Sequence, residues 1–296
     1  MIRHVHWITN PKGGVGDNVA LAHRARDILQ EHGISSEIVV TQHAGHARKL
    51  VEELNFEDGH VIGGIGGDGT MHELINGLMQ RPERERMPLT LLPGGTGNSF
   101  LRDLGCLDPV EVLKGLRSPA RRLIDLFEVQ IGDSVHYGFN IVGWALFSYA
   151  NELAESLRWI GRRRYDVAAF IRLMQNRHFE ARLEFDGQVV EGCFAFLAAS
   201  NTVHTGDNMK LAPRAQLDDG KLDLVYLRNV NRRTMLSLFK GLKEGRHVDS
   251  PEVKYYQVSE FTLRTDEELS IVLDGELIEG GSCSVRVLPG SLELLI

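Results

Sequence analysis

The distribution of hydrophobic and polar positions differs between the two halves of the chain. In the first 124 residues, short apolar runs alternate with longer segments in which apolar residues recur every three or four positions. This alternation predicts a mostly parallel sheet covered by helices. Further along, short strand-like runs follow one another closely, which is typical of antiparallel sheets. The pattern predicts an α/β plus all-β fold class, with an α/β domain at 1–124 and an antiparallel β-sandwich domain at 125–296, whose last strand could return to the first domain.

Capping residues and glycines indicate where the elements begin and end. Asp17 is expected to cap a helix in which Leu21, Ala25 and Leu29 repeat at helical spacing, and Gly33 is expected to end it. The expected strands of the first domain are 5–9, 37–41, 61–65 and 89–92, with further helices near 44–54 and 71–79. The expected strands of the second domain include 181–185, 189–199, 222–227, 253–258, 269–273 and 284–288, with helical insertions at 144–174 and 232–243.

Composition narrows the classes of function. The chain is 43% hydrophobic and 25% charged, which is ordinary for a globular protein. Its net charge of −7 disfavours nucleic acid as a partner, because phosphate contacts need a basic surface. The three cysteines, Cys106, Cys193 and Cys283, are too widely spaced for a zinc motif. The 12 histidines include no HExxH motif and no compact metal-binding group in the sequence, so most are expected to be surface or structural residues.

Three glycine-containing loops each follow an expected strand and precede an expected helix. They are 10–16 (NPKGGVG), 63–70 (GGIGGDGT) and 93–98 (PGGTGN). Glycines let backbone N–H groups approach an anion, and a helix N-terminus adds positive potential. One such loop is more often a tight turn without a ligand. Three at the carboxyl ends of one sheet favour a site that binds phosphates.

Other nucleotide-binding and catalytic motifs fit the chain less well. Residues 64–69 match GxGxxG, but the acidic residues about twenty positions later, Glu83 and Glu85, lie in a charged connector rather than at a strand end. This disfavours an NAD-binding oxidoreductase. The sequence contains no Walker motif, no protein-kinase HRD or DFG element and no GxSxG motif. A nucleotide site in this chain would therefore be of a type that uses none of these motifs.

The three loops, in this order, resemble the diacylglycerol kinase catalytic-domain family, which includes bacterial lipid kinases and sphingosine kinases. The GGDGT run at 66–70 is the most specific element, and further likeness is found at 212–213 (AP), 217–223 (LDDGKLD) and 274–276 (DGE). The resemblance spans nearly the whole chain. It implies a nucleotide-binding α/β domain like that of phosphofructokinases and NAD kinases. It also implies transfer of the γ-phosphate of ATP, with Mg²⁺, to a hydroxyl of a lipid such as diacylglycerol or a sphingoid base.

The resemblance also implies roles for individual residues. Asp274 would be the general base, with Glu276 beside it, and Asp68 would contact Mg²⁺ or organise the site. A structural Mg²⁺ would be bound by Asp219 and by the backbone carbonyls of Gln216 and Lys221. The residues implied for the ATP site are Asn10, Lys12, Thr41, Gly66, Gly67, Asp68, Gly69, Thr96 and Asn98.

The residues alone leave a plainer alternative open for each carboxylate. Asp68, between glycines, is also suited to an N-cap or an Asx turn. The Asp274-Gly275 pair lies between expected strands as Asp186-Gly187 does, and both pairs are typical of hairpin turns. Asp219 could lie in a solvated turn before a strand.

Two departures from the family pattern keep other functions open. Gly13 stands where the first loop usually has serine, and Ser99 stands where bacterial diacylglycerol kinases usually have aspartate. The second departure leans towards sphingosine-kinase-like relatives. The alternatives are an NAD kinase-like phosphotransferase with a soluble acceptor, and a non-catalytic nucleotide-binding regulator.

A basic and aromatic cluster in the first helical insertion suggests contact with a membrane. Arg158, Trp159 and 162–165 (RRRY) have a composition suited to lipid headgroups, although a solvated helix face is the plainer alternative. No apolar signal segment precedes the first strand. We therefore expect a cytoplasmic protein that is transiently at the membrane surface, with ATP and a membrane lipid as partners and a homodimer as an alternative to a monomer.

Overall fold

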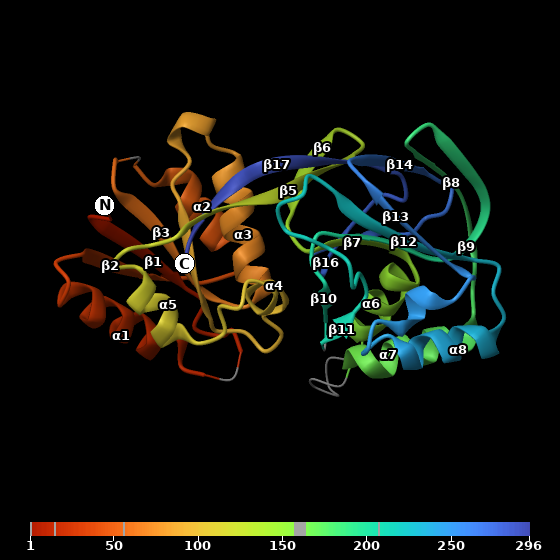
Figure 1. The fold of residues 1–296 in the computed structure, drawn as a ribbon, viewed down its shortest axis with the longest axis horizontal. Coiled ribbons are helices and arrows are strands. Elements are labelled where there is room, and N and C mark those ends of the chain that lie inside the picture. The colour runs from red at the N-terminus through yellow and green to blue at the C-terminus, as the bar shows by residue number, and fades with distance from the viewer. Residues whose placement is uncertain (1, 15, 56, 157–163, 207) are drawn as a thin grey trace. The chain divides into compact units, whose positions relative to one another are not determined.

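A computed structural model describes residues 2–14, 16–55, 57–156, 164–206 and 208–296 (Figure 1). Contacts within the chain divide it into two compact units. The N-terminal unit comprises Met1–Leu126 and Pro289–Ile296, and the C-terminal unit comprises Phe127–Leu288.

The N-terminal unit is built on a parallel sheet with the strand order β4-β3-β1-β2. These strands are β1 (His4–Thr9), β2 (Ser35–Val40), β3 (His60–Gly66) and β4 (Leu89–Pro93). The end of β17 (Cys283–Leu295) joins β4 in parallel, with Leu294 opposite Leu89. The helices are α1 (Asn18–Gln30), α2 (His46–Glu53), α3 (Asp68–Met79), α4 (Ser99–Asp103) and α5 (Pro109–Gly115), with a 3-10 turn at Glu83–Glu85.

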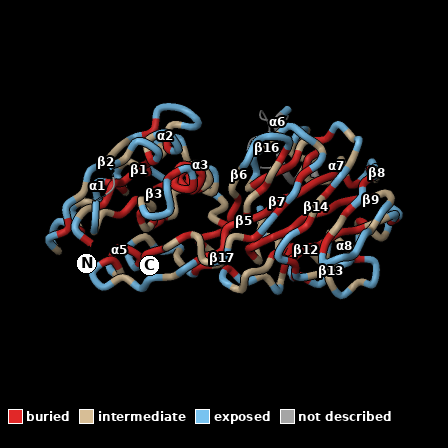
Figure 2. Tube along the Cα trace, turned by 90° about the horizontal axis from the view of Figure 1, so that it is seen from above, coloured by how far each residue is buried: buried red, intermediate tan, exposed pale blue. Residues whose placement is uncertain are grey.

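Helices cover both faces of this sheet. Val5 and Trp7 of β1 are buried against α1 and α5, in a core that includes Ala25 and Leu113. Successive residues of a strand point to opposite faces. His4, His6 and Ile8 therefore face the other side, which is the side of α3, because Leu74 of that helix packs against Gly64 of β3. Figure 2 shows that much of α3 is buried, whereas α1 carries more exposed positions.

Local signals set the ends of the first helix. The backbone N–H of Ala20 donates to Oδ1 of Asp17 at 2.9 Å, so the predicted N-cap is confirmed. The helix ends at Gln30, and Gly33 follows with a φ of 73°, the left-handed conformation that glycine adopts most easily.

The C-terminal unit is a largely antiparallel sheet assembly. Its pairing runs β16-β15-β7-β9-β8-β14-β17, with β12 paired to β9, β13 paired to β12, and β6 paired to β5. Its strands are β5 (Arg121–Ile131), β6 (Ser134–Gly138), β7 (Ile141–Ala145), β8 (Phe179–Phe185), β9 (Gln188–Ser200), β12 (Leu222–Arg228), β13 (Val253–Val258), β14 (Glu260–Arg264), β15 (Ile271–Leu273) and β16 (Glu276–Ile278), with β17 completing the set. A small separate pair is formed by β10 (His204–Thr205) and β11 (Met209–Lys210).

Three helices accompany this sheet: α6 (Leu146–Ser156), α7 (Arg164–Gln175) and α8 (Arg232–Gly241), with a 3-10 turn at Arg246–Asp249. One apolar core contains Phe127, Trp144 and Phe194, and a second one, which includes Met235 of α8, lies between the sheet and the helices. The predicted α/β plus all-β fold class is confirmed. The first insertion differs from the prediction, because its opening residues form the buried strand β7 rather than a helix.

The basic and aromatic cluster predicted to touch a membrane lies largely outside the described residues. Residues 157–163 are not described, and of Arg164 and Tyr165 only the backbone is placed, within α7. Within the described part of the chain, no helix combines the length and the apolar character needed to cross a membrane.

Candidate active site

The three glycine loops lie side by side at the carboxyl ends of β1, β3 and β4. The N–H of Asn10 donates to the carbonyl of Ile65 at 3.1 Å, and the N–H of Gly94 donates to the carbonyl of Gly66 at 2.9 Å. Each loop is therefore hydrogen-bonded to its neighbour as it leaves the sheet. The parallel register of the three strands brings together loops that start 53 and 30 residues apart in the sequence, at residues 10, 63 and 93.

Glycine is required where the loops meet because their backbones touch. Gly14 has a φ of 78°, and a Cβ there would lie 1.9 Å from the carbonyl oxygen of Gly94. A Cβ on Gly95 would lie 2.3 Å from Cα of Gly67. The N-terminus of α3 begins beside this contact, at Asp68. Side chains are excluded here, which leaves backbone N–H groups to line a cradle for an anion.

Two glycines assigned to the second loop have a different role. Gly63 and Gly64 lie inside β3 and are buried. A Cβ on Gly63 would lie 2.2 Å from the Trp7 ring, and one on Gly64 would lie 2.5 Å from Leu74. These two glycines make room for core side chains, so only the part of this loop from Gly66 onward stays a candidate for binding phosphate.

Asn18 is a site residue that the sequence reasoning missed. Its side chain is buried at the first position of α1, and Nδ2 donates to the carbonyls of Asn10 and Gly13, both at 2.8 Å. It thereby fixes the first loop from inside. A Cβ at Gly13 would lie 3.2 Å from this Nδ2, a tight approach that fits glycine at the position where the family usually has serine. The only sequence signal was a polar residue directly after the N-cap Asp17.

Asp68 joins the second loop to the third. It is the first residue of α3, whose N-cap is Gly67 and lacks a side-chain cap, so the N-cap alternative for Asp68 is wrong. Its Oδ2 accepts a hydrogen bond from the backbone N–H of Ser99 at 3.2 Å. Ser99, which stands where bacterial diacylglycerol kinases usually have aspartate, thus contributes its backbone N–H. The Asp68 carboxylate is held between the second and third loops.

Asn98 shapes the third loop. It has a φ of 49°, and its side chain accepts from the N–H of Gly95 at 3.1 Å and donates to the carbonyl of Gly95 at 3.0 Å. This pair of hydrogen bonds closes the turn that places Gly95 against Gly67. Asn98 therefore organises the third loop, and its predicted place in the ATP site stays a prediction.

The other residues implied for the ATP site are spread around the same sheet edge. Oδ1 of Asn10 accepts from the N–H of Lys12 at 2.9 Å, and its Nδ2 donates to Oγ1 of Thr70 at 3.5 Å. Thr41 is buried at the end of β2, with its N–H donating to the carbonyl of Thr9 at 2.9 Å. Gly69 lies in the first turn of α3, and Lys12 and Thr96 are exposed on their loops.

Asp274 lies in the C-terminal unit, in a hairpin turn between β15 and β16. Its φ is 52°, and Leu273 and Glu276 pair across the turn. The carboxylate accepts hydrogen bonds from three successive backbone N–H groups. Phe139 donates at 3.2 Å, Asn140 at 2.9 Å and Ile141 at 3.0 Å. The hairpin alternative is correct, yet the side chain is also fixed by a distant segment. Glu276 is exposed at the start of β16.

The proposed structural Mg²⁺ site lies in a tight turn before β12. Oδ1 of Asp219 accepts from the N–H of Lys221 at 2.9 Å, and Gly220 between them has a φ of 72°. Asp223 is buried, and that burial raises its pKa to about 6, with the nearby Asp219 adding to the shift. Asp218, Asp219 and Asp223 form no three-carboxylate cluster in the described part of the chain. The Mg²⁺ assignment, with Gln216 and Lys221 as carbonyl ligands, therefore stays a prediction.

Comparison with protein families gives two matches that together cover most of the chain. The diacylglycerol kinase catalytic domain matches residues 4–129. The YegS C-terminal NAD kinase beta sandwich-like domain matches residues 141–296, more than half of the chain.

Individual relatives agree with these matches. Sphingosine kinase 2 of Arabidopsis thaliana is 25% identical and covers 92% of this chain, which in turn spans 68% of that protein. A diacylglycerol kinase of Mycobacterium tuberculosis is 26% identical and covers 99% of this chain and 95% of its own. Among solved structures, a protein from Bacillus anthracis superposes with a TM-score of 0.80 at 25% identity, covering 99% of this chain and 96% of that one. The chain belongs to the diacylglycerol kinase catalytic-domain family.

Proposed function

We propose that this protein is an ATP-dependent lipid kinase that transfers the γ-phosphate of ATP to a hydroxyl of a lipid such as diacylglycerol or a sphingoid base. Its family supports the kinase class. The observation that carries the proposal is the backbone packing of three glycine loops at one sheet edge. Side chains are excluded at Gly14, Gly67 and Gly95, as a phosphate cradle requires.

Phosphoryl transfer depends mainly on positioning and on neutralising charge. In this proposal, backbone N–H groups of the three loops and the N-terminus of α3 bind and orient the triphosphate of ATP. The Asp68 carboxylate, which accepts a hydrogen bond from the N–H of Ser99, would hold Mg²⁺. Mg²⁺ would neutralise charge on the phosphate oxygens. Asn18 and Asn98 keep the loops in the shape that makes these contacts.

The proton of the acceptor hydroxyl needs a base, and we assign this role to Asp274. Three backbone N–H groups fix the orientation of its carboxylate. A general base of this kind contributes about 10²–10⁴-fold to a rate. Glu276, two residues further along the chain, is exposed and adds a second negative charge near Asp274.

A lipid acceptor is favoured over a soluble one by the named relatives, which include sphingosine kinases and diacylglycerol kinases. A lipid acceptor requires contact with a membrane surface. We keep the basic segment around 158–165 as the proposed docking element, although it lies largely outside the described residues. Liposome co-sedimentation that is unchanged after replacing the three arginines at 162–164 would contradict this role.

The test is transfer of labelled phosphate from ATP, with Mg²⁺, to mixed micelles containing diacylglycerol or sphingosine, with NAD as a soluble acceptor in a parallel reaction. Wild-type protein is expected to label a lipid, and Asp68→Asn is expected to lower that rate about 100-fold because the metal loses a charged ligand. Labelling of NAD alone would support the NAD kinase-like alternative. Binding of ATP without transfer to any acceptor would support a regulator.

A further inference from the structure

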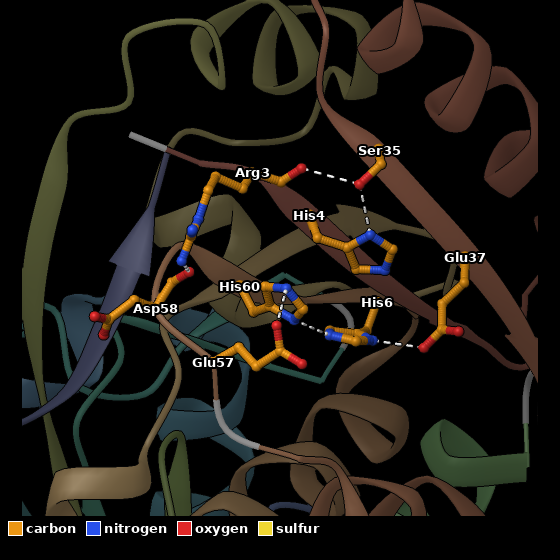
Figure 3. Close-up of polar contacts among 8 residues, drawn as sticks. All are labelled: Arg3, His4, His6, Ser35, Glu37, Glu57, Asp58 and His60. Atoms are coloured by element: carbon orange, nitrogen blue, oxygen red, sulfur yellow. Dashed lines mark hydrogen bonds and ion pairs between the residues drawn. The ribbon is translucent and has the colours of Figure 1, made fainter.

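A group of histidines and carboxylates lies at the amino ends of β1, β2 and β3, the opposite end of these strands from the glycine loops. His4 and His6 lie two residues apart on β1 and therefore point to one face. The parallel register places His60 of β3 opposite His4, and Glu37 of β2 opposite His6. Figure 3 shows the four side chains gathered on that face, with Glu57 at the far side of His60.

The hydrogen bonds of Ser35 define which nitrogen of His4 is available. The Ser35 hydroxyl donates to the carbonyl of Arg3 at 3.0 Å, so its oxygen accepts from Nδ1–H of His4 at 2.7 Å. A neutral imidazole with its proton on Nδ1 has a lone pair on Nε2. His4 thus presents a ligand nitrogen towards Glu37 and His6 (Figure 3).

Three further contacts link Glu37, His6, His60 and Glu57 into a chain, and this chain has one hydrogen atom too few. Nδ1 of His6 lies 2.5 Å from Oε1 of Glu37, Nε2 of His6 lies 2.9 Å from Nδ1 of His60, and Nε2 of His60 lies 3.3 Å from Oε2 of Glu57. In each of these three contacts a nitrogen faces an oxygen or another nitrogen. The contact is favourable only if a hydrogen atom or a cation lies between the two atoms. Two neutral imidazoles carry two N–H groups and ionised carboxylates carry none, so the chain needs one further cation.

We propose that His4, His6 and Glu37 bind a Zn²⁺ ion. With the ion on Nδ1 of His6, the two N–H groups that remain are sufficient, because His6 can donate to His60 and His60 can donate to Glu57. His60 and Glu57 then hold the His6 ring in place, as partners of metal-bound histidines commonly do. The ligand atoms of His4, His6 and Glu37 already lie within 4.8 Å of one another.

The chemistry of the donors favours zinc over magnesium. Two imidazoles and one carboxylate suit Zn²⁺, whereas Mg²⁺ prefers oxygen ligands alone. Zinc with bonds of about 2.0–2.2 Å needs ligand atoms roughly 3.4 Å apart. The Glu37 side chain is 51% exposed and can rotate to reach this spacing, and its exposure also gives the ion a path from solvent. The bound ion would tie β1 to β2 and so stabilise the N-terminal sheet.

The test uses full-length protein without a histidine tag. Metal is first removed with a chelator, and nucleotide is removed as well because it would itself bind zinc. We expect isothermal titration with Zn²⁺ to give one site per chain. We also expect Co²⁺ to produce visible absorption bands typical of four or five ligands, and one equivalent of Zn²⁺ to remove them. Zn²⁺ should raise the melting temperature of the protein. Weak binding of several ions, or Co²⁺ bands that Zn²⁺ does not displace, would overturn the proposal.

Variants separate this site from other surface histidines. His4→Gln and Glu37→Gln should each weaken Zn²⁺ binding at least ten-fold, and Ser35→Ala should weaken it because it frees the His4 ring. His43→Gln, which removes an exposed histidine stacked on His46, should bind Zn²⁺ as wild type does. Glu37 is exposed, so circular dichroism is expected to show that its variant folds normally. Unchanged affinity in both ligand variants would show that Zn²⁺ binds elsewhere and would overturn the proposal.

Discussion

Two hairpins in the C-terminal unit have the same turn sequence and the same backbone conformation, but their aspartates have different surroundings. Asp186 and Asp274 have φ values of 46° and 52°, and each is followed by a glycine with positive φ. The Asp274 carboxylate accepts three hydrogen bonds from residues 139–141. Asp186 is exposed, and its side chain makes no hydrogen bond in the described part of the chain. Local sequence therefore determines the turn, and a distant segment determines what the aspartate can do.

The largest difference is expected in catalysis. Asp274→Asn should lower the rate of phosphate transfer at least about 100-fold, because an amide cannot accept the proton of the acceptor hydroxyl. Asp186→Asn, the matched control, should stay within about two-fold of wild type. Steady-state rates at saturating ATP measure both. Equal rates for the two variants would remove Asp274 from the proposed mechanism.

A smaller difference is expected in stability. Asp274→Ala and Asp186→Ala both place alanine at a left-handed position, so the strain of that change is shared. Asp274→Ala additionally leaves three backbone N–H groups without their acceptor, which costs about 1–3 kcal/mol beyond the shared strain. Urea unfolding of the two variants gives this difference directly. A difference near zero would mean that water replaces the carboxylate without loss.

The smallest difference is expected at the glycines of the two turns. Gly187 and Gly275 have φ values of 73° and 100°. Alanine at either position should cost about 1–2 kcal/mol, with little difference between the two variants, because the strain is local. Thermal unfolding of Gly187→Ala and Gly275→Ala measures it. A much larger loss at Gly275 would show that this turn is restrained by more than its own backbone.

The sequence predicted the features that depend on local signals. The parallel order of the first strands, the cap at Asp17 and the positions of the three loops all follow from spacing and residue type. The sequence did not predict the role of a residue where that role depends on a partner far away in the chain. Gly63 and Gly64 looked like loop glycines because glycine is unusual inside a strand, and only the Trp7 ring explains the first of them. The role of Asn18 depends on carbonyls that the folded first loop turns towards it.

The histidine group at the amino ends of β1–β3 shows the same limit. His6 and His60 are 54 residues apart, and no spacing rule joins them. No compact metal-binding group was expected among the histidines, yet the ligand atoms of His4, His6 and Glu37 lie within 4.8 Å of one another. Strand register is what brings the side chains together.

The strand β17 has a consequence for biosynthesis. Its last residues are buried in the N-terminal unit, where Leu295 joins a core containing Val5 and Trp7. The backbones of Ala120 and Ile296 exchange two hydrogen bonds, at 3.0 Å and 3.1 Å. A ribosome delivers the first strands well before this one. The N-terminal unit must therefore wait, incompletely packed, until translation has passed Ile296, and replacing the apolar residues of Pro289–Ile296 would damage a unit whose other strands are made much earlier.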